Sequence, residues 1–383
     1  MEITVPYTKR KDKEDNEGGK SMKFQFIGLG AAGNKAMVDI VNAGVAKPED
    51  VILINSTTKD FVDCDGVDNK VVLNPQNTGC GKERRIAREY AEKALKLHSI
   101  KINENTTNVL LVTSVEGGTG SGATPVIAEA IRKKGVNIHI CAFIGFEDDV
   151  RGLQNTVEFF KEISSLEADI MTIRNASFNE EAKYNKFKAE ELANQELVKR
   201  AAILTGQNLI VSGQNIDDTD IFKVVSTSGY KTIEEIKFSE NLMDQEQFNK
   251  LCKEMIYRSH SLVSENPGQV RLGVILNIKP ESEDAIDYTF KAFKDAYGMP
   301  YEMFFHKQYD GKEQYIQFIS SGMKLPLEEV KAVYTRYKDQ TKKVDKSNDA
   351  FNEMVNSFEF DEVDSMFDMV RSSKTVINTN KED

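Results

Sequence analysis

The stretch that most restricts the fold is VEGGTGSGA, from Val115 to Ala123. Four glycines lie within six positions, between an apolar run and a predicted helix. A glycine costs roughly 0.5–1 kcal/mol of conformational entropy relative to alanine, so a cluster of glycines needs a structural cause. At a junction between strand and helix, the cluster indicates either a turn that only glycine permits or the close approach of a large anion to the backbone.

The surrounding pattern is that of an α/β fold. Short apolar runs that predict strands alternate with segments of helical periodicity. Such an alternation indicates a parallel sheet with helices on both faces. The predicted strands are Lys23–Gly28, Val51–Asn55, Asn108–Thr113, Val136–Ile144 and Ala168–Ile173, and the predicted helices are Ala32–Asn42, Lys82–His98, Gly122–Lys134 and Val150–Ser164.

A long central helix is predicted from Tyr184 to Thr205, and the pattern changes after it. Three strands (Arg271–Ile278, Glu302–His306, Gln314–Ser320) and one helix (Glu281–Tyr297) predict a smaller mixed α/β C-terminal domain. From Leu327 the charge-rich sequence predicts one further helix. The expected divisions are residues 1–22 (a flexible N-terminal arm), 23–183 (the parallel-sheet domain), 184–206 (central helix), 207–325 (second domain) and 326–383 (C-terminal helix and tail).

Composition excludes several classes of protein. The chain of 383 residues carries a net charge of −11, which disfavours sequence-independent binding of nucleic acid by the body of the protein. No apolar run approaches the ~20 residues that span a bilayer, and the polar, mixed-charge start does not resemble a signal peptide. Four cysteines and four histidines are scattered without metal-ligand spacing. We therefore expect a cytoplasmic protein without a zinc site or direct membrane binding.

A second glycine-rich turn, GLGAAGN from Gly28 to Asn34, follows the first predicted strand. It matches G-x-G-x-x-G, the dinucleotide-binding fingerprint, in which backbone N–H groups and a helix N-terminus face phosphate. A dinucleotide-binding protein usually has an acidic residue at the end of its second strand, whereas that strand here ends in Asn55–Ser56–Thr57. A nucleotide- or dinucleotide-dependent metabolic enzyme stays open as one reading of this turn.

GGTGSG resembles the signature loop of the tubulin/FtsZ GTPases, with Glu116 in place of the first glycine of the family pattern GGGTG[TS]G. GLGAAGN resembles the first nucleotide loop of that family, NSTTKD (Asn55–Asp60) the second, and Gly79–Cys80–Gly81 the third. The resemblance implies a tubulin/FtsZ-like GTPase that binds GTP or GDP with Mg²⁺, in which residues 23–183, the parallel sheet with helices on both faces, are the nucleotide-binding domain. The implied phosphate-loop residues are Gly30, Ala31, Ala32, Asn34, Gly79, Gly81, Gly117, Gly118, Thr119, Gly120 and Ser121.

The resemblance extends to the sugar and the base. Glu147 and Arg151 reproduce a Glu-x-x-x-Arg spacing that contacts ribose and phosphate in FtsZ, and a helical i,i+4 ion pair is the alternative. Asn175 stands where the family reads the guanine edge, and Asn194 where the central helix touches the base. FtsZ usually has an aspartate after that second asparagine, whereas this chain has Gln195.

The segment NIDDTD, from Asn215 to Asp220, is similar to the family's N-x-D-x-x-D synergy loop. The resemblance implies that Asp217 and Asp220, helped by Asn215, polarise the attacking water on the GTP of the next subunit. Hydrolysis would then be coupled to self-association into a longitudinal filament. On local physics alone, three acids in four positions would also suit a helix N-terminus; the spacing of an EF-hand calcium loop is absent.

The resemblance covers roughly Lys23 to Tyr337, and both ends look most like the plasmid- and phage-encoded TubZ branch. That branch moves DNA through an adaptor that binds the C-terminal tail. The tail here includes the acidic, partly apolar segment Phe358–Val370, so we expect a protein adaptor and no direct DNA contact by the tail. The alternative for the tail is a solvated extension that packs on the body. The alternative for the whole protein is an FtsZ-like cell-division GTPase or another cytoskeletal filament GTPase.

Overall fold

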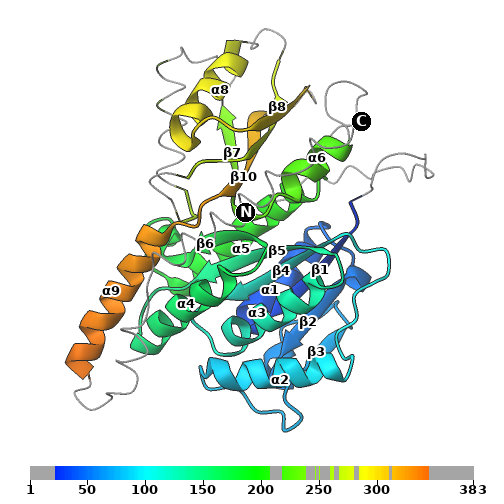
Figure 1. Ribbon diagram of the computed structural model, residues 1–383, viewed down its shortest axis with the longest axis vertical. Helices are drawn as coiled ribbons and strands as arrows, with labels where there is room; N and C mark the ends of the chain where they lie inside the picture. The colour runs from blue at the N-terminus through cyan, green and yellow to red at the C-terminus, as the bar shows by residue number, and fades with distance from the viewer. Residues whose placement is uncertain are drawn as a thin grey trace, which may run out of the picture.

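The computed structural model describes residues 22–207, 218–238, 246, 250, 259–262, 267–279, 284–309 and 313–344. Its strands form one sheet in the order β3-β2-β1-β4-β5-β6-β7-β10-β8-β9, which runs through the molecule in Figure 1. The predictions for the N-terminal arm, for Asn215 and Asp217, and for the tail segment Phe358–Val370 lie outside the described residues.

Six strands form a parallel sheet: β1 (Phe24–Leu29), β2 (Val51–Asn55), β3 (Lys70–Val72), β4 (Asn108–Ser114), β5 (Asn137–Ile144) and β6 (Asp169–Arg174). β2 and β4 are buried almost throughout, which explains their continuous apolar sequences. β1 lies between β2 and β4, so the strand order reverses there. Parallel α/β sheets bind ligands at the carboxyl ends of the strands beside such a switch point.

Helices cover both faces of this sheet, as the sequence predicts. On one face, α1 (Gly30–Asn42), α5 (Lys186–Leu204) and α6 (Asp218–Val225) share a hydrophobic core with one set of strand side chains. On the other, α2 (Arg84–Lys96), α3 (Thr119–Arg132) and α4 (Val150–Ile163) pack on the alternate set. The connections also contain three 3₁₀ turns, η1 (Pro48–Asp50), η2 (Thr58–Phe61) and η3 (Asn175–Phe178).

The C-terminal strands continue the same sheet. They are β7 (Gly229–Phe238), β8 (Arg271–Asn277), β9 (Glu302–Gln308) and β10 (Gln314–Met323), with α8 (Asp284–Tyr297) between β8 and β9. β7 is parallel to β6 over only two residue pairs, and β10 is antiparallel to β7 and β8. The sequence pattern does not predict β7, because its buried residues include the charged Lys231 and Glu234.

The helix predicted from Leu327 is present as α9, Leu327–Val344. Figure 1 shows it along the outer side of α4, where Val333 and Tyr337 pack against apolar side chains of α4. An ion pair of 2.6 Å joins Arg336 of α9 to Glu147, in the loop before α4. α9 is therefore attached to α4 and to the loop that precedes it.

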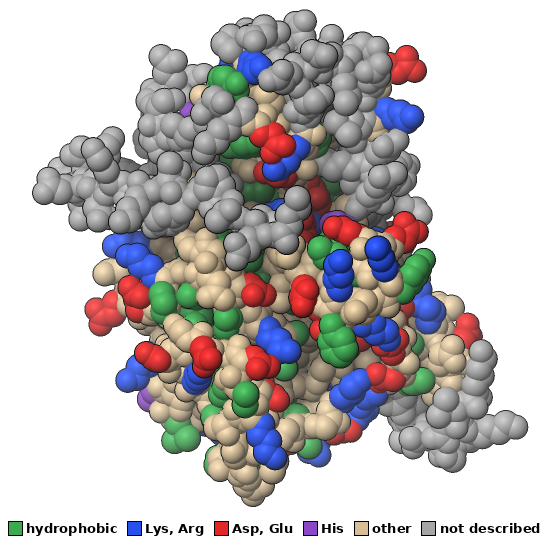
Figure 2. Space-filling view, turned by 180° about the vertical axis from the view of Figure 1, so that it is seen from behind, with side chains coloured by type: hydrophobic (Ala, Val, Ile, Leu, Met, Phe, Trp, Pro, Cys, Tyr) green, Lys and Arg blue, Asp and Glu red, His purple; other side chains and the backbone are tan. Residues whose placement is uncertain are grey.

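The surface carries both signs of charge. On the face drawn in Figure 2, Lys and Arg side chains lie interspersed with Asp and Glu side chains across the described part of the chain. Among the described helices, none combines the length and the apolar character that a membrane span requires.

Candidate functional site

The loops that follow β1, β2 and β4 meet at the switch point. A Cβ atom added to Gly30, in the turn after β1, would lie 3.2 Å from the backbone nitrogen of Gly120, in the turn after β4. The hydroxyl of Ser56, directly after β2, lies 2.9 Å from that of Thr119. The glycine-rich turns that the sequence singles out are therefore neighbours in space.

Glycines in the loops after β3 and β4 serve two different purposes. An added Cβ would lie 2.8 Å from backbone at Gly118 and 2.2 Å from backbone at Gly122. At Gly120 it would lie 2.3 Å from the Thr113 hydroxyl and 3.0 Å from the Leu29 carbonyl, so these three glycines allow close packing. Gly118 and Gly122 pack on the loop after β3, around Lys82 and Arg84. Three others have nothing within 4 Å of that position and leave an open surface: Gly79, Gly81 and Gly117.

α1 and α3 both begin in these turns, and neither N-terminus has a side-chain cap or an acidic residue in its first turn. By contrast, Asp149 caps α4 by accepting a hydrogen bond of 2.9 Å from Gly152 N–H. Ala31 and Ala32, in the first turn of α1, are exposed. Two uncapped helix N-termini side by side present free N–H groups and aligned dipoles to an anion.

α3 begins at Thr119, three residues before the predicted start, because Gly120 and Gly122 serve as close-packing positions inside its first turn. Two hydroxyls reinforce that turn. Ser121 is buried and its hydroxyl donates to the carbonyl of Gly117, while the Thr124 hydroxyl donates to the Gly120 carbonyl at 2.7 Å. The side chain of Ser121 therefore shapes the loop from inside.

The asparagines of the first two loops are buried. Asn34 directs its amide nitrogen to the Ile54 carbonyl, at 3.4 Å, and so ties α1 to β2 instead of facing the open side. The Asn55 oxygen accepts from the Ser56 N–H at 2.7 Å. Within the described part of the chain, the Asn55 amide nitrogen has no hydrogen-bond partner.

Glu147 and Arg151 lie beside the phosphate loop but do not pair with one another. Glu147 precedes α4 and pairs with Arg336, whereas Arg151 contacts Glu83 and donates to Gln154 at 2.8 Å. The backbone N–H of Glu147 donates to the Glu116 carboxylate at 3.1 Å. Burial raises the pKa of Glu116, and this hydrogen bond opposes the rise. The helical ion pair considered above does not form.

Asn155 of α4 was not singled out by the sequence. Its buried amide donates to the carbonyls of Lys82 and Glu116, both at 3.0 Å, and to that of Gly117 at 3.3 Å. One side chain thus fixes the loops after β3 and β4 to α4. An asparagine in the middle of an amphipathic helix gives no local signal of such a role.

Asn175 and Asn194 lie on the side of the site formed by η3 and α5. The Asn175 side chain is buried, and its oxygen has no hydrogen-bond partner among the described residues. An unsatisfied buried acceptor costs about 1–3 kcal/mol, so it calls for a functional or structural cause. The Asn194 amide nitrogen donates to Asp39 of α1 at 2.8 Å.

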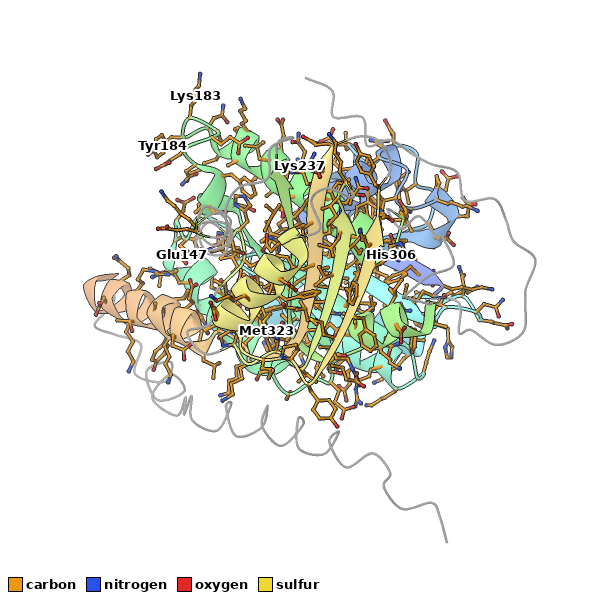
Figure 3. All side chains as sticks on the ribbon, turned by 90° about the horizontal axis from the view of Figure 1, so that it is seen from above. Glu147, Lys183, Tyr184, Lys237, His306 and Met323 are labelled. Atoms are coloured by element: carbon orange, nitrogen blue, oxygen red, sulfur yellow. The ribbon has the colours of Figure 1, made fainter. Side chains whose placement is uncertain are left out.

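The turn that leads into α5, beside the candidate site, projects from the surface of the protein. Lys183 and Tyr184 point away from the body in Figure 3, in the turn that leads into α5. Both have positive φ angles, 50° and 60°, which non-glycine residues seldom adopt. The Tyr184 side chain is 75% exposed.

Asp220 lies near the amino ends of the parallel strands, away from the glycine turns at their carboxyl ends. It belongs to α6 and its carboxylate is 3.5 Å from Lys223. Ser226, just after α6, accepts from Asn137 at the amino end of β5, whereas the glycine turns follow carboxyl ends of strands. α5 has 19 residues and is about 28 Å long, which is comparable with the distance between the two ends of the strands.

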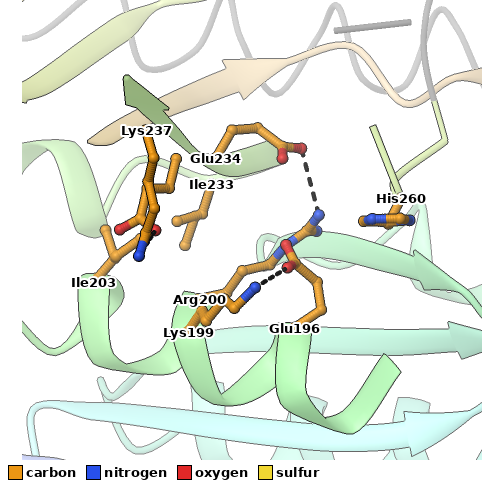
Figure 4. Close-up of a pocket in the computed structure, with 9 residues that line it drawn as sticks. Glu196, Lys199, Arg200, Ile203, Ile233, Glu234, Lys237 and His260 are labelled. Atoms are coloured by element: carbon orange, nitrogen blue, oxygen red, sulfur yellow. Dashed lines mark hydrogen bonds and ion pairs between the residues drawn. The ribbon is translucent and has the colours of Figure 1, made fainter. Parts of the chain in front are cut away.

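A cavity of about 350 Å³ between α5 and β7 is distinct from the glycine turns. Figure 4 shows Arg200 between Glu196 and Glu234, with ion-pair distances of 2.8 and 3.3 Å. Arg200 also donates to the Thr172 carbonyl and the Ser261 hydroxyl. These partners make Arg200 a buried connection between the central helix and the C-terminal part of the sheet.

Comparison with known proteins agrees with this geometry. Residues 23–183 match the family model described as the Tubulin/FtsZ family, GTPase domain. Tubulin-like protein CetZ1 of Haloferax volcanii is 23% identical over 239 residues (55% of this chain, 58% of CetZ1). Cell division protein FtsZ of Mycoplasmopsis pulmonis is 25% identical over 213 residues (54% and 53%). The chain therefore spans a little over half the length of these relatives.

A crystal structure of a GTPγS-form protofilament of TubZ from Bacillus thuringiensis serovar israelensis shares the fold. Its TM-score is 0.70 at 14% sequence identity, over 84% of this chain and 93% of that one. The tubulin/FtsZ-like fold extends well beyond the matched domain.

Proposed function

We propose that this chain binds and hydrolyses GTP as the subunit of a filament, because residues 23–183 match the GTPase domain of the tubulin/FtsZ family. The observation that carries the proposal is the pair of uncapped helix N-termini, α1 and α3, side by side at the switch point of a parallel sheet. Such a surface suits the phosphates of a nucleotide better than any neutral ligand.

In this proposal the triphosphate lies on the open glycines and against the first turns of α1 and α3. Gly117, Gly79 and Gly81 supply backbone without side chains, and the exposed Ala31 and Ala32 flank the α1 N-terminus. Gly118, Gly120 and Ser121 act through the backbone conformation that they permit. Their side-chain positions are filled or buried from within the protein.

The nucleoside would be contacted by four side chains, those of Asn175, Asn194, Glu147 and Arg151. The orphaned oxygen of Asn175 supports a ligand donor there, because a hydrogen bond from the base would satisfy it. Arg151 would exchange its partner Glu83 for a nucleotide oxygen, while Glu147 stays fixed to α9 by Arg336. These assignments are consistent with one nucleotide that extends from the α1 N-terminus toward α5.

Mg²⁺ fits this site only through the nucleotide. Among the residues that the structure describes, no group of three or more His, Cys, Asp or Glu side chains is placed to hold a metal ion. Mg²⁺ commonly keeps several waters and binds substrate phosphates, where it neutralises developing charge. The protein would supply the position of the phosphates.

Hydrolysis in this proposal requires two subunits. Asp220 belongs to α6, which ends at the amino ends of the strands, so its carboxylate would not reach a nucleotide bound at the glycine turns of its own chain. A head-to-tail contact would bring the acidic edge of one subunit onto the nucleotide edge of the next and would propagate as a filament. Asp217 and Asp220, with Asn215, would then orient the attacking water. Protofilament formation by the TubZ with the same fold supports this arrangement.

We further propose that the filament moves plasmid or phage DNA in the cytoplasm through a protein adaptor at the C-terminal tail. An FtsZ-like role in cell division, or another cytoskeletal role, is the alternative, since the chain is similar to CetZ, FtsZ and TubZ proteins at 22–25% identity. Pull-down experiments with a DNA-bound adaptor and with a membrane adaptor distinguish the two roles. Capture by the first adaptor supports DNA segregation, and capture by the second supports cell division.

The proposed activity is tested by sedimentation and electron microscopy with GTP, GDP and a slowly hydrolysed GTP analogue, together with phosphate release at increasing protein concentration. Filaments should form with GTP and persist with the analogue. Phosphate release per subunit should rise with concentration. A rate per subunit that is independent of concentration would contradict hydrolysis between subunits.

A further inference from the structure

The side of α1 that meets α5 at Asp39 leads away from the glycine turns. Ala31, Lys35 and Asp39 lie four residues apart along α1 and form a stripe that is exposed or half-exposed. Asp39 is nine residues from Gly30, about 13 Å along the helix axis. This length is comparable with the reach of a purine nucleotide from its phosphates to the far edge of its base. Asn194 of α5 contacts this stripe at Asp39.

The hydrogen bond from Asn194 to Asp39 fixes the orientation of the Asn194 amide, that is, the directions of its nitrogen and its oxygen. An ionised carboxylate only accepts hydrogen bonds, so the amide must turn its NH₂ group toward Asp39. Its oxygen then points away from Asp39. Burial raises the pKa of Asp39, and the bond from Asn194 and the charge of Lys35 oppose that rise, whereas Glu191 adds to it.

We propose that Asp39 sets the base specificity of the site by holding the Asn194 oxygen toward the purine, an inference that rests on the GTP binding proposed above. Guanine presents two donors on its pairing edge, N1–H and the 2-amino group, which an amide oxygen accepts. Adenine presents an unprotonated N1, which an amide oxygen repels. Asp39 thereby supplies, from α1, the acidic partner that the sequence lacks after Asn194, where Gln195 stands. It acts as a positioning residue.

The inference is tested by measuring the affinities of the full chain for GTP, ITP and ATP, by competition with a fluorescent GTP analogue. Asp39→Asn keeps the size of the side chain but can donate to the Asn194 oxygen, so the amide can turn over. The GTP-over-ATP preference should then fall by about tenfold or more, the value of one misdirected hydrogen bond at 1.4 kcal/mol per tenfold. ITP, which lacks the 2-amino group, should lose less than GTP.

Glu191→Gln is the control, because it removes a carboxylate that acts on Asp39 through charge. It should keep the wild-type preference. In a double-variant cycle, Asp39→Ala should change the preference little once Asn194→Ala is present. Thermal melting in the absence of nucleotide verifies that each variant is folded.

The possible outcomes are distinct. An Asp39→Asn variant with the wild-type GTP-over-ATP ratio would overturn the inference and leave the proposed function standing. An Asp39→Ala effect that is undiminished in the Asn194→Ala background would overturn action through Asn194. Wild-type protein that binds no GTP would overturn the proposed function, and this inference with it.

Discussion

Gly120 and Gly117 lie three residues apart, yet replacing each with alanine should have opposite consequences. A Cβ at Gly120 would lie 2.3 Å from the Thr113 hydroxyl, 3.0 Å from the Leu29 carbonyl and 3.2 Å from that of Ser114. Two of these three neighbours are backbone atoms of β1 and β4, which cannot yield without moving the sheet. Gly120→Ala therefore overpacks the junction and should destabilise the fold by about 1–3 kcal/mol.

The assay is thermal melting without nucleotide, followed by GTP titration. Each kcal/mol lost should lower the melting temperature by roughly 2–4 °C in a domain of 150–250 residues. Gly117→Ala meets nothing within 4 Å, so it should melt like the wild type but weaken GTP binding, because its methyl group stands on the open side of the loop. A Gly120→Ala variant of unchanged stability, or a Gly117→Ala variant of unchanged GTP affinity, would refute this reasoning.

Three further outcomes follow from buried polar groups. Lys231 is buried 2.6 Å from Asp169, so Lys231→Met should lower the free energy of unfolding, measured in urea, by about 3–5 kcal/mol. Lys237 forms an exposed pair with Glu313, so Lys237→Met should lower it by only about 0–1 kcal/mol. Equal losses for the two variants would contradict this difference between buried and exposed pairs. Burial lowers the pKa of His260 from 6.5 to about 4, so the unfolded chain takes up a proton first and stability falls as pH drops from 6.5 to 4. Urea unfolding across this range should give a flatter pH dependence for His260→Asn, and an unchanged slope would count against it. Asn175→Ala should weaken GTP binding and leave ATP binding unchanged, measured by competition titration; equal losses would give Asn175 a structural role.

The glycine-rich turns of the candidate site could be predicted from the sequence because the need for glycine there is local. Bare backbone beside the end of a strand needs glycine, and the turns around Gly30 and Gly117 show that need in the order of the residues. The sequence could not separate the two purposes of these glycines. Whether a missing side chain faces solvent, as at Gly117, or neighbouring backbone, as at Gly120, depends on the packing of distant segments.

Partners that come from other elements were not predictable. Asp39 meets Asn194 across 155 positions of sequence, and Arg336 meets Glu147 across 189. β7 was missed because Lys231 and Glu234 interrupt its apolar pattern, although tertiary ion pairs satisfy both of them inside the protein. Buried charge is rare enough that a pattern of alternating hydrophobicity does not allow for it.

The central claim, that each active site is completed by the next subunit, is tested most directly by mixing two inactive variants. The first, Asp217→Ala/Asp220→Ala, keeps its nucleotide site but lacks the acidic edge. The second, Gly117→Asp, keeps the acidic edge but places a charged side chain where the phosphates would lie. Neither should release phosphate from GTP alone at more than a small fraction of the wild-type rate. Mixed in equal amounts and sedimented together, they should recover phosphate release, because the acids of the second variant complete the nucleotide site of the first. Co-sedimenting filaments that stay inactive at every mixing ratio would contradict hydrolysis between subunits.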